Sequence, residues 1–291
     1  MTDIIASPST RRLAREKDVD IDALAKRLGR TTIAPEDLDR RPGAEQAADT
    51  ALWDVDHAQY GAVSDEPMSR FAQVAARNMA AAQSLIPAVT HHDRADVTAM
   101  EAFRHSLRSE AEGRGVKLTA LAFHVVALAR CLRRFGRFNA SLSSDGQRLI
   151  LKDYVHIGIA VDTPHGLMVP VIRDADRKGL WQIAAEIADL AARAQARKIK
   201  PAEMGGASMT ITNLGGIGGT AFSPIVNPPE VAILGITRTE TVTIWDGDTP
   251  RPVPMVPLDL SYDHRVINGA DAARFMAHYC TLIADPRHMM I

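Results

Sequence analysis

Two kinds of apolar periodicity run along the chain and predict both helices and strands. Apolar residues three and four positions apart predict helices over 69–83, 97–113, 180–199 and 269–284, and residues 118–134 are apolar on most faces, as in a buried helix. Alternating apolar residues predict strands over 154–161, 167–172, 208–213, 231–236, 241–245 and 255–262. Helices come early and strands cluster late. Residues 67–291 are therefore predicted to form a mixed α/β domain, a mixed sheet covered by helices, rather than a doubly wound sheet.

The start of the chain has a different pattern. Residues 4–41 combine many charges with short helical signals, and Ser7 or Ser9 can cap a helix whose first turn tolerates Pro8. The segment "APEDL" repeats this arrangement, with Pro35 and acidic residues at a helix start. So few large apolar residues make a marginal core, and a module of this kind usually exists to bind something.

The segment between the two zones is predicted to be a linker. Residues 42–66 are rich in alanine, glycine and acidic residues and show no sustained helical period. Trp53, Val55 and Tyr60 indicate that the second half of the linker lies against a surface. The predicted boundaries are therefore 1–41 for a small helical domain, 42–66 for the linker and 67–291 for the large domain.

Composition narrows the class of protein. The chain has 291 residues, 46% of them hydrophobic, and its net charge of −1 argues against nucleic acid as a main partner. Cys131 and Cys280 lie in apolar helical patterns and are predicted to be reduced core thiols. The most apolar run, 118–132, contains His124 and Arg130 and is too short to span a bilayer. We therefore expect a soluble, intracellular protein that does not act in a membrane.

The glycine-rich stretch "NLGGIGGTAF" (213–222) resembles a loose dinucleotide-binding fingerprint. That chemistry needs a helix to begin directly after the glycines, so that its free amides and dipole face the phosphates. The next residues are "SPIVNPPE", whose three prolines prevent a helix from starting there. A glycine-rich turn beside a buried site is the better prediction.

Two other features have competing interpretations. His91 and His92 are adjacent, and neighbouring strand residues point to opposite faces, so this pair is not expected to bind a metal. The basic residues of the first zone can be either a solvated helix face or a docking surface. They are Arg11, Arg12, Arg15, Lys26, Arg27 and Arg30.

The stretch "SYDHRVINGADAARF" (261–275) holds the most informative pair of polar residues. His264 ends a predicted strand and is either a catalytic base or a hydrogen-bonded structural residue. Asn268 precedes Gly269 and a helical pattern, with Asp271 three residues later, so it suits a helix N-cap as well as a site residue. The residues alone leave both alternatives open.

The segment "DHRVING" resembles the HRxxDG signature of the 2-oxo acid dehydrogenase acyltransferases, the E2 cores of multienzyme complexes, to which chloramphenicol acetyltransferase is distantly related. The resemblance extends across nearly all of 67–291. It is carried by "IPAVTHHDRADVT", "RFNASLSSDGQRLILKDYVHIGIAVDTPHGLMVPVI", "MTITNLGGIGGTAFSPIVNPPEVAILGI" and "PLDLSYDHRVINGADAARF". The stretch "RFNASLSSDGQRL" is most similar to bacterial acetyltransferases of pyruvate dehydrogenase. Residues 4–41 resemble the family's peripheral-subunit-binding domain, with "AKRLGRTTI" in place of its usual glycine-rich loop.

The resemblance implies acetyl exchange between dihydrolipoamide and coenzyme A, without a metal. His264 would then be the base for the thiol, and Thr212 would donate to the oxyanion, with its neighbour Asn213 as a second choice. Strand alternation places the Thr212 side chain with those of Ser208 and Thr210. Asn268 stands where the family has an acid that orders the site by pairing with an arginine. Arg104, in "AFRHS", is the expected partner.

The resemblance also implies partners. We expect a homotrimer in the cytoplasm of a bacterium, with His264 of one subunit facing Thr212 of the next. Any larger assembly is expected to form through the apolar C-terminal residues Met289, Met290 and Ile291. The E1 or E3 component of a complex is expected to dock on residues 4–41, partly through Arg11, Arg12 and Arg15. No stretch upstream of that module can form a lipoyl domain, so the lipoyl group is expected from another domain or chain.

Two further functions compete with this one. A structural or E3-binding scaffold would keep the fold and the docking module but not the chemistry, and Asn268 together with the missing lipoyl domain favours it. The retained residues His264, Thr212 and Arg104 favour an active enzyme. A free-standing acetyltransferase for a small amine or hydroxyl is disfavoured by the binding module at 4–41.

Overall fold

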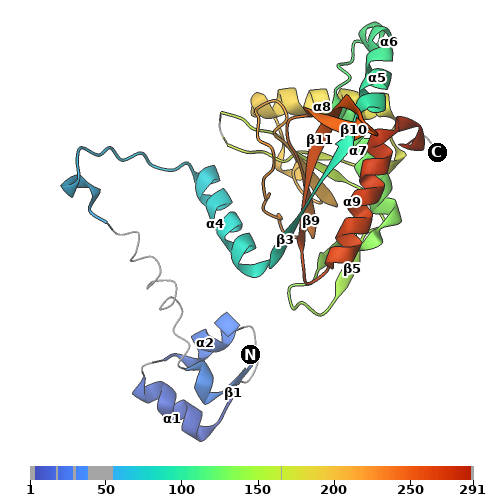
Figure 1. Cartoon of the computed structure of the whole chain (residues 1–291). Coiled ribbons are helices and arrows are strands. Elements are labelled where there is room, and N and C mark those ends of the chain that lie inside the picture. Colours follow the sequence, from blue (N-terminus) through green and yellow to red (C-terminus); the bar gives the residue numbers. More distant parts are fainter. Residues whose placement is uncertain (1–3, 18, 29–30, 39–54, 165, 290–291) are drawn as a thin grey trace. The chain divides into compact units, whose positions relative to one another are not determined.

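The structure, a computed structural model, describes residues 4–17, 19–28, 31–38, 55–164 and 166–289 (Figure 1). The chain divides into two compact units, Met1–Pro67 and Met68–Ile291. Residues 42–54 of the predicted linker, with Trp53, lie outside the described residues, as do residues 39–41. Each unit is described by itself.

The first unit contains two short helices, α1 (Pro8–Glu16) and α2 (Ile21–Leu28). Ser7 caps α1 as predicted, because its hydroxyl accepts a hydrogen bond from the Thr10 amide at 3.1 Å. Strands β1 (Ile5–Ala6) and β2 (Thr32–Ile33) pair in parallel. The small core is made of Ala14, Leu24, Ala25, Ile33 and Leu38. The segment "APEDL" forms only the single 3-10 turn Pro35–Asp37, in which the Asp37 carboxylate accepts from the Ala34 amide at 2.8 Å.

Residues 55–66 are the described part of the predicted linker. The one regular element here is the 3-10 turn His57–Gln59. The Tyr60 side chain is 78% exposed and that of Val55 is 43% exposed. The prediction that these aromatic and aliphatic groups pack on a surface remains a prediction, and Trp53 lies outside the described residues.

One mixed sheet organises the second unit, with strand order β10-β11-β9-β8-β6-β7 and β3 paired with β11. Its strands are β3 (Ala88–Asp96), β6 (Ile157–Ala160), β7 (Val171–Ile172), β8 (Met209–Asn213), β9 (Ala232–Ile236), β10 (Glu240–Asp246) and β11 (Thr249–Asp263). Strands β6, β8 and β9 are parallel, and the remaining pairs are antiparallel. The mixed sheet predicted from the pattern is confirmed.

Helices cover one face of this sheet (Figure 1). They are α7 (Ala120–Arg134), α8 (Leu180–Gln195) and α9 (Gly269–Ala284), with α5 (Thr98–Ser106) and α6 (Arg108–Gly113) beyond the end of β3. Every second strand residue enters the core beneath them, as alternation requires. These residues include Ile157, Ile159, Met209, Ile211, Leu234, Leu258 and Leu260, packed with Leu128 and Phe275.

Several predicted limits differ from the observed elements. The region 97–113 is two helices that meet at Leu107, and α4 (Arg70–Leu85) replaces the predicted 69–83. β11 begins at Thr249, six residues before its predicted start, although it contains Pro250, Pro252 and Pro254. These prolines occur at every second position, so their missing amide hydrogens face the same edge and the ladder to β10 survives. The hairpin of β4 (Ala140–Leu142) and β5 (Leu149–Leu151) has strands of only three residues, too short to show a period.

The two cysteines are free, as predicted, with Cys131 buried and Cys280 half-buried. Burial raises the pKa of the Cys280 thiol to about 12, which keeps it protonated and unreactive at neutral pH. Among the described helices, none combines the length and the apolar character needed to cross a bilayer.

A buried polar pair joins α7 to α9 inside the core. His124 Nδ1 and the Tyr279 hydroxyl are 2.7 Å apart, and both side chains are buried. Burial lowers the pKa of His124 to about 4, because a charged imidazole loses its hydration there. The histidine is therefore neutral in the folded protein at pH 7.

This pair predicts a specific loss of stability in acid. The folded-state pKa of His124 lies below the unfolded value of 6.5, so the stability that it contributes is complete above pH 6.5 and is lost as pH falls towards 4. The full loss is about 3 kcal/mol in the free energy of unfolding. Urea unfolding of wild type and His124→Gln between pH 4 and 7.5 measures it, and the gap between the two proteins should narrow or reverse in acid. A gap that does not change with pH contradicts the assignment.

Candidate active site

The second face of the sheet carries polar side chains where the first carries apolar ones. Residues that alternate with the core positions of β8, β11 and β3 are hydroxyl, carboxyl or imidazole groups: Ser208, Thr210, Thr212, Asp259, Ser261, Asp263, Thr90 and His92. Asp259, Ser261 and Asp263 are each at most 2% exposed. Buried polar groups need partners, and neighbouring strands supply them. The hydroxyls of Thr90 and Ser261, for example, are 2.8 Å apart.

Thr212 lies near the end of β8, with its side chain half-buried on this polar face. It pairs with Ala160 on one side and with Gly235 on the other, and neither has a side chain large enough to cover it. Because β8 is a regular strand, the Thr212 side chain lies on the same face as those of Ser208 and Thr210, as predicted. A threonine hydroxyl in this position can donate to a ligand oxygen.

Asn213 has a different use. Its Oδ1 accepts a hydrogen bond from the Gly215 amide at 2.8 Å and so starts the glycine-rich turn. Residues 214–230 contain no helix, which confirms that the glycines form a turn and not a dinucleotide-binding loop. Gly219, with φ 91°, uses backbone freedom that other residues rarely have.

His264 directly follows β11 and its side chain is exposed. The His264 amide donates to the Pro87 carbonyl at 3.1 Å, which fixes its backbone against the start of β3. On either side, Asp263 and Arg265 form an ion pair with 2.7 Å between Nη2 and Oδ2. This pair holds the turn rigid while the imidazole stays accessible, as a base for an incoming substrate must be.

Asn268 caps α9, which confirms the structural alternative for this residue. Its Oδ1 accepts from the Asp271 amide at 2.9 Å, and its own backbone is extended. The side chain is exposed, four residues beyond His264. Asn268 therefore orients the first turn of the helix that follows the candidate base.

Arg104 does not reach Asn268 in the same chain, so that part of the sequence prediction is wrong within one subunit. Its guanidinium donates twice to Glu101 on its own helix, at 2.6 and 2.9 Å. Asn268 follows the end of β11 that pairs with Ala88, whereas α5 follows the opposite end of β3. A nine-residue strand at about 3.3 Å per residue separates these two positions by roughly 25 Å.

The candidate base and the candidate oxyanion donor also lie apart within one chain. Register places Thr212 opposite Gly235, and Gly235 opposite Asp259, so Thr212 is about 10 Å from β11 across two strand spacings. His264 follows the end of β11, five residues beyond Asp259, which adds about 17 Å along the strand direction. One subunit therefore holds half of the predicted constellation at each end of the sheet.

Glu230 is a buried acid that the sequence prediction missed. It is 6% exposed, and its Oε1 accepts from the Thr210 hydroxyl at 3.0 Å, two residues before Thr212. Burial raises the pKa of this carboxyl to about 7, and the nearby Lys152 ammonium only partly opposes the effect. An acid directly after two prolines gave no pattern from which its burial could be recognised.

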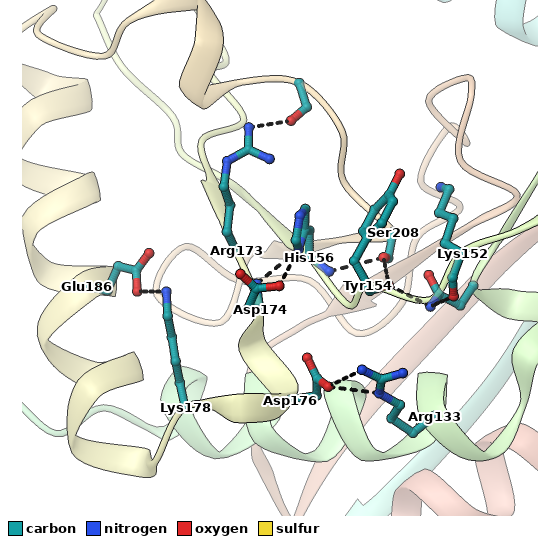
Figure 2. A network of polar contacts seen from close by, with 12 residues as sticks. Arg133, Lys152, Tyr154, His156, Arg173, Asp174, Asp176, Lys178, Glu186 and Ser208 are labelled. Atoms are coloured by element: carbon teal, nitrogen blue, oxygen red, sulfur yellow. Dashed lines mark hydrogen bonds and ion pairs between the residues drawn. The ribbon is translucent and has the colours of Figure 1, made fainter.

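A second polar network lies at the start of β6 (Figure 2). His156 Nδ1 accepts from the Asp174 amide at 2.9 Å, and the Ser208 hydroxyl accepts from the His156 amide at 3.1 Å. Nearby, Arg133 of α7 pairs with Asp176. These contacts join the segments that precede β6, β8 and α8, so we assign them a structural role.

The predicted docking residues differ in how free they are. Arg11 is tied to its own module, since it donates to the carbonyls of Ile4 and Ala6 at 2.8 and 3.3 Å. Arg12 is 80% exposed and faces Glu16 at 3.5 Å, and Arg15 is also exposed. The side chains of Lys26 and Arg27, and Arg30 as a whole, lie outside the described residues.

The C-terminal prediction is changed at one residue. Met289 is 5% exposed and belongs to the core of its own domain, so it is not free for assembly contacts. Met290 and Ile291 lie outside the described residues. Elsewhere, His92 Nδ1 is 2.6 Å from Asp259 Oδ1, and the described part of the chain contains no cluster of three or more groups that could hold a metal ion.

Comparison with known proteins supplies a context for these residues. The model of the 2-oxoacid dehydrogenases acyltransferase (catalytic domain) family matches residues 60–291. The dihydrolipoyllysine-residue acetyltransferase component of the pyruvate dehydrogenase complex of Azotobacter vinelandii is 46% identical over 300 residues, covering 98% of this chain and 47% of that protein. The chain spans about half the length of this protein and of two other curated relatives that it matches.

Two solved structures are similar in fold and sequence. One comes from work on the role of a serine, a histidine and an asparagine in catalysis by the Azotobacter vinelandii dihydrolipoamide acetyltransferase. It is 50% identical with a TM-score of 0.80, covering 81% of this chain and 98% of that one. The other is the cubic core of a pyruvate dehydrogenase multienzyme complex, with the same identity, TM-score and coverage.

Glu230 generates a prediction opposite in sign to that for His124. Its folded-state pKa lies above the unfolded value of 4.5, so its contribution to stability is complete below pH 4.5 and is lost as pH rises through about 7. Glu230→Gln keeps a neutral group of similar shape. Chemical unfolding from pH 4.5 to 8.5 should show the variant gaining on wild type by up to about 3 kcal/mol. If wild type and variant respond alike to pH, the carboxyl is not protonated in the folded protein.

Proposed function

Because the chain belongs to the 2-oxoacid dehydrogenases acyltransferase family, we propose that it transfers an acetyl group between dihydrolipoamide and coenzyme A. The observation that carries this proposal is the pair His264 and Thr212, one at each end of the polar face of the sheet. The serine, histidine and asparagine studied in the Azotobacter enzyme stand at the same sequence spacings as Thr212, His264 and Asn268. An asparagine at this position therefore does not favour an inactive scaffold.

His264 is proposed as the general base. A thiol with a pKa of about 8.5 is mostly protonated at neutral pH, and an imidazole with a pKa near 6.5 can accept its proton as the sulfur attacks. Attack on the acetyl thioester carbonyl forms a tetrahedral intermediate whose oxygen is negative. When the intermediate collapses, the imidazolium returns the proton to the departing sulfur, which leaves as a thiol.

Thr212 is proposed as the donor to that oxyanion. Its half-buried hydroxyl lies between two small neighbours, Ala160 and Gly235, so a carbonyl oxygen can approach it. A hydrogen bond formed only as the charge develops lowers the barrier by about 3–4 kcal/mol. Asn268 contributes by capping α9, which holds the turn that carries His264.

The complete site is proposed to form between copies of the chain. His264 and Thr212 of one subunit are too far apart to act on one thioester, so each must meet its counterpart from a neighbour. A closed ring of subunits gives every His264 one Thr212, and we propose a ring of three. The similar cubic core supports larger assembly, for which Met290 and Ile291 remain candidates.

Substrates and partners complete the proposal. Coenzyme A is a substrate, and the dihydrolipoyl group is carried on another domain or chain. We place the protein in the bacterial cytoplasm, in keeping with its bacterial relatives and with coenzyme A as substrate. Residues 4–41 are proposed as a peripheral-subunit-binding domain that docks the E1 or E3 component.

Removing either half of the site should abolish most turnover. His264→Ala is expected to lower kcat for acetyl transfer from acetyl-CoA to dihydrolipoamide by about 10²–10⁴-fold, and Thr212→Ala by about 10²–10³-fold. His57→Ala removes an exposed histidine elsewhere and serves as the matched control. Wild type without turnover, or turnover unchanged in His264→Ala, overturns the proposed function.

Mixed assemblies test where the site forms. If His264 and Thr212 act from different subunits, random co-assembly of His264→Ala with Thr212→Ala restores some intact sites, about a quarter of them in a trimer. Co-expression with two affinity tags isolates the mixed particles. Mixed particles no more active than the single variants place both residues in one chain's own site.

Docking should depend on the exposed arginines of the first unit, Arg12 and Arg15. Replacing Arg12 and Arg15 together with alanine in the full chain is expected to weaken binding of E1 or E3 by at least about threefold, and the wild-type interaction should weaken as salt is raised. Titration calorimetry at two NaCl concentrations measures both effects. Arg77→Ala, an exposed arginine of α4, is the control, and affinities insensitive to salt and to the double change contradict a charged docking surface.

A further inference from the structure

Four residues on four neighbouring strands form a row across the polar face of the sheet. Thr212 of β8 is opposite Gly235 of β9, Gly235 is opposite Asp259 of β11, and Asp259 is opposite His92 of β3. Residues directly opposite one another on adjacent strands point to the same face. The candidate oxyanion donor and the carboxylate of Asp259 therefore lie on one face with only a glycine between them.

The space above Gly235 is filled by the ring of Phe222. A Cβ added at position 235 would lie 2.7 Å from two atoms of that ring and 3.2 Å from Cβ of Asp259. Phe222 is the last residue of the glycine-rich loop that begins after Thr212 and Asn213. The absence of a side chain at Gly235 thus lets the loop fold back onto the sheet beside Thr212.

Asp259 holds the loop in this place. Its Oδ2 accepts from the Phe222 amide at 3.3 Å, while its Oδ1 lies 2.6 Å from His92 Nδ1. The carboxylate is 1% exposed, and the imidazole is half-exposed beside a cavity of about 410 Å³ that Thr220 and Glu240 also line. Each oxygen of Asp259 therefore has its own partner. Loss of Oδ2 would leave the Phe222 amide without this acceptor.

The other attachments of the loop are made by residues at strand ends. Arg238 donates to the Ile217 carbonyl at 2.7 Å, and the Thr237 hydroxyl donates to the Thr220 carbonyl at 3.3 Å. Both donors follow β9 and hold the middle of the loop. The bond from Asp259 is the attachment at the end of the loop, and it reaches the loop from inside the sheet.

We propose that Asp259, fixed by His92, is a positioning residue for acetyl transfer, which anchors the glycine-rich loop at Phe222 and so fixes the wall of the site beside Thr212. The inference rests on the proposed function, because it assigns Asp259 an effect that acts through Thr212. With the anchor lost, the Phe222 ring no longer holds its place over Gly235, and the Thr212 hydroxyl loses its fixed surroundings. The transition state should then lose stabilisation while substrate binding is largely kept.

The test compares Asp259→Ala, Asp259→Asn and Ser261→Ala in steady-state kinetics. We expect Asp259→Ala to lower kcat about tenfold with little change in KM, as one hydrogen bond in the transition state would. Asparagine keeps an oxygen for the Phe222 amide and should retain kcat within about twofold. Ser261 is buried on the same face of β11 and bonds Thr90 without touching the loop, so Ser261→Ala is the matched control and should keep kcat.

A double-mutant cycle separates positioning from general weakening. In a Thr212→Ala background the further change Asp259→Ala should lower kcat by less than about twofold, because the group through which it acts is gone. The proposal is overturned if the fold-losses of kcat in Thr212→Ala and Asp259→Ala multiply in the double variant. It is also overturned if Ser261→Ala loses as much kcat as Asp259→Ala. Asp259→Ser, which fills the buried position but is too short to reach both His92 and Phe222, replaces the alanine variant if that fails to fold.

Hydrogen–deuterium exchange gives a readout that does not need activity. The Phe222 amide should exchange faster in Asp259→Ala than in wild type, while exchange in β9 stays unchanged. Unchanged protection at Phe222 overturns the anchor. If wild type shows no acetyl transfer but the Phe222 amide responds as expected, the proposed function fails and the anchor stands.

Discussion

Alternation of side chains along the long strand β11 is the constraint on which the catalytic unit depends. Leu258 and Leu260 enter the core under the helices, while Asp259, Ser261 and Asp263 are buried on the opposite face. A strand cannot place both sets on one face, so the sheet has an apolar side and a polar side. Each buried polar group is satisfied by a neighbouring strand or loop, through His92, Thr90 and Arg265 respectively.

On the polar side, strand register decides which side chains lie next to one another. Register brings Thr212 level with Gly235 and Asp259, and the bare position at Gly235 lets the glycine-rich loop lie on the sheet. The same register carries β11 on to His264, beyond the other end of the sheet. A rigid sheet therefore fixes both halves of a site with precision, yet separates them by more than a substrate bond can span. In the proposed reaction, a second subunit would bring them together.

Buried ionisable groups give the two sides of the sheet opposite responses to pH. On the helical side burial keeps His124 neutral, and protonation in acid would place a charge in the core. On the polar side burial keeps Glu230 protonated up to about neutral pH, and its ionisation at higher pH would place a charge among buried groups. Both groups contact structural partners, Tyr279 and Thr210, so each reports on the integrity of its own layer.

Much of the secondary structure and several local contacts could be predicted from the amino-acid pattern alone. Apolar periods located α7, α8, α9 and most strands, because burial on one face imposes those periods on any helix or strand. Local chemistry fixed the caps at Ser7 and Asn268 and the turn after Asn213, since these hydrogen bonds span only a few residues. Polar segments gave no such signal. The polar strand β3 was given no predicted limits, the strands of the β4–β5 hairpin are too short to show a period, and the prolines of β11 hid its first half. Which polar residues meet could not be predicted in this way and follows from the folded chain. The tertiary structure paired Arg104 with Glu101, buried Met289 and Glu230, and joined His92 to Asp259 across 167 residues, because such contacts depend on strand order and register, which no local pattern encodes.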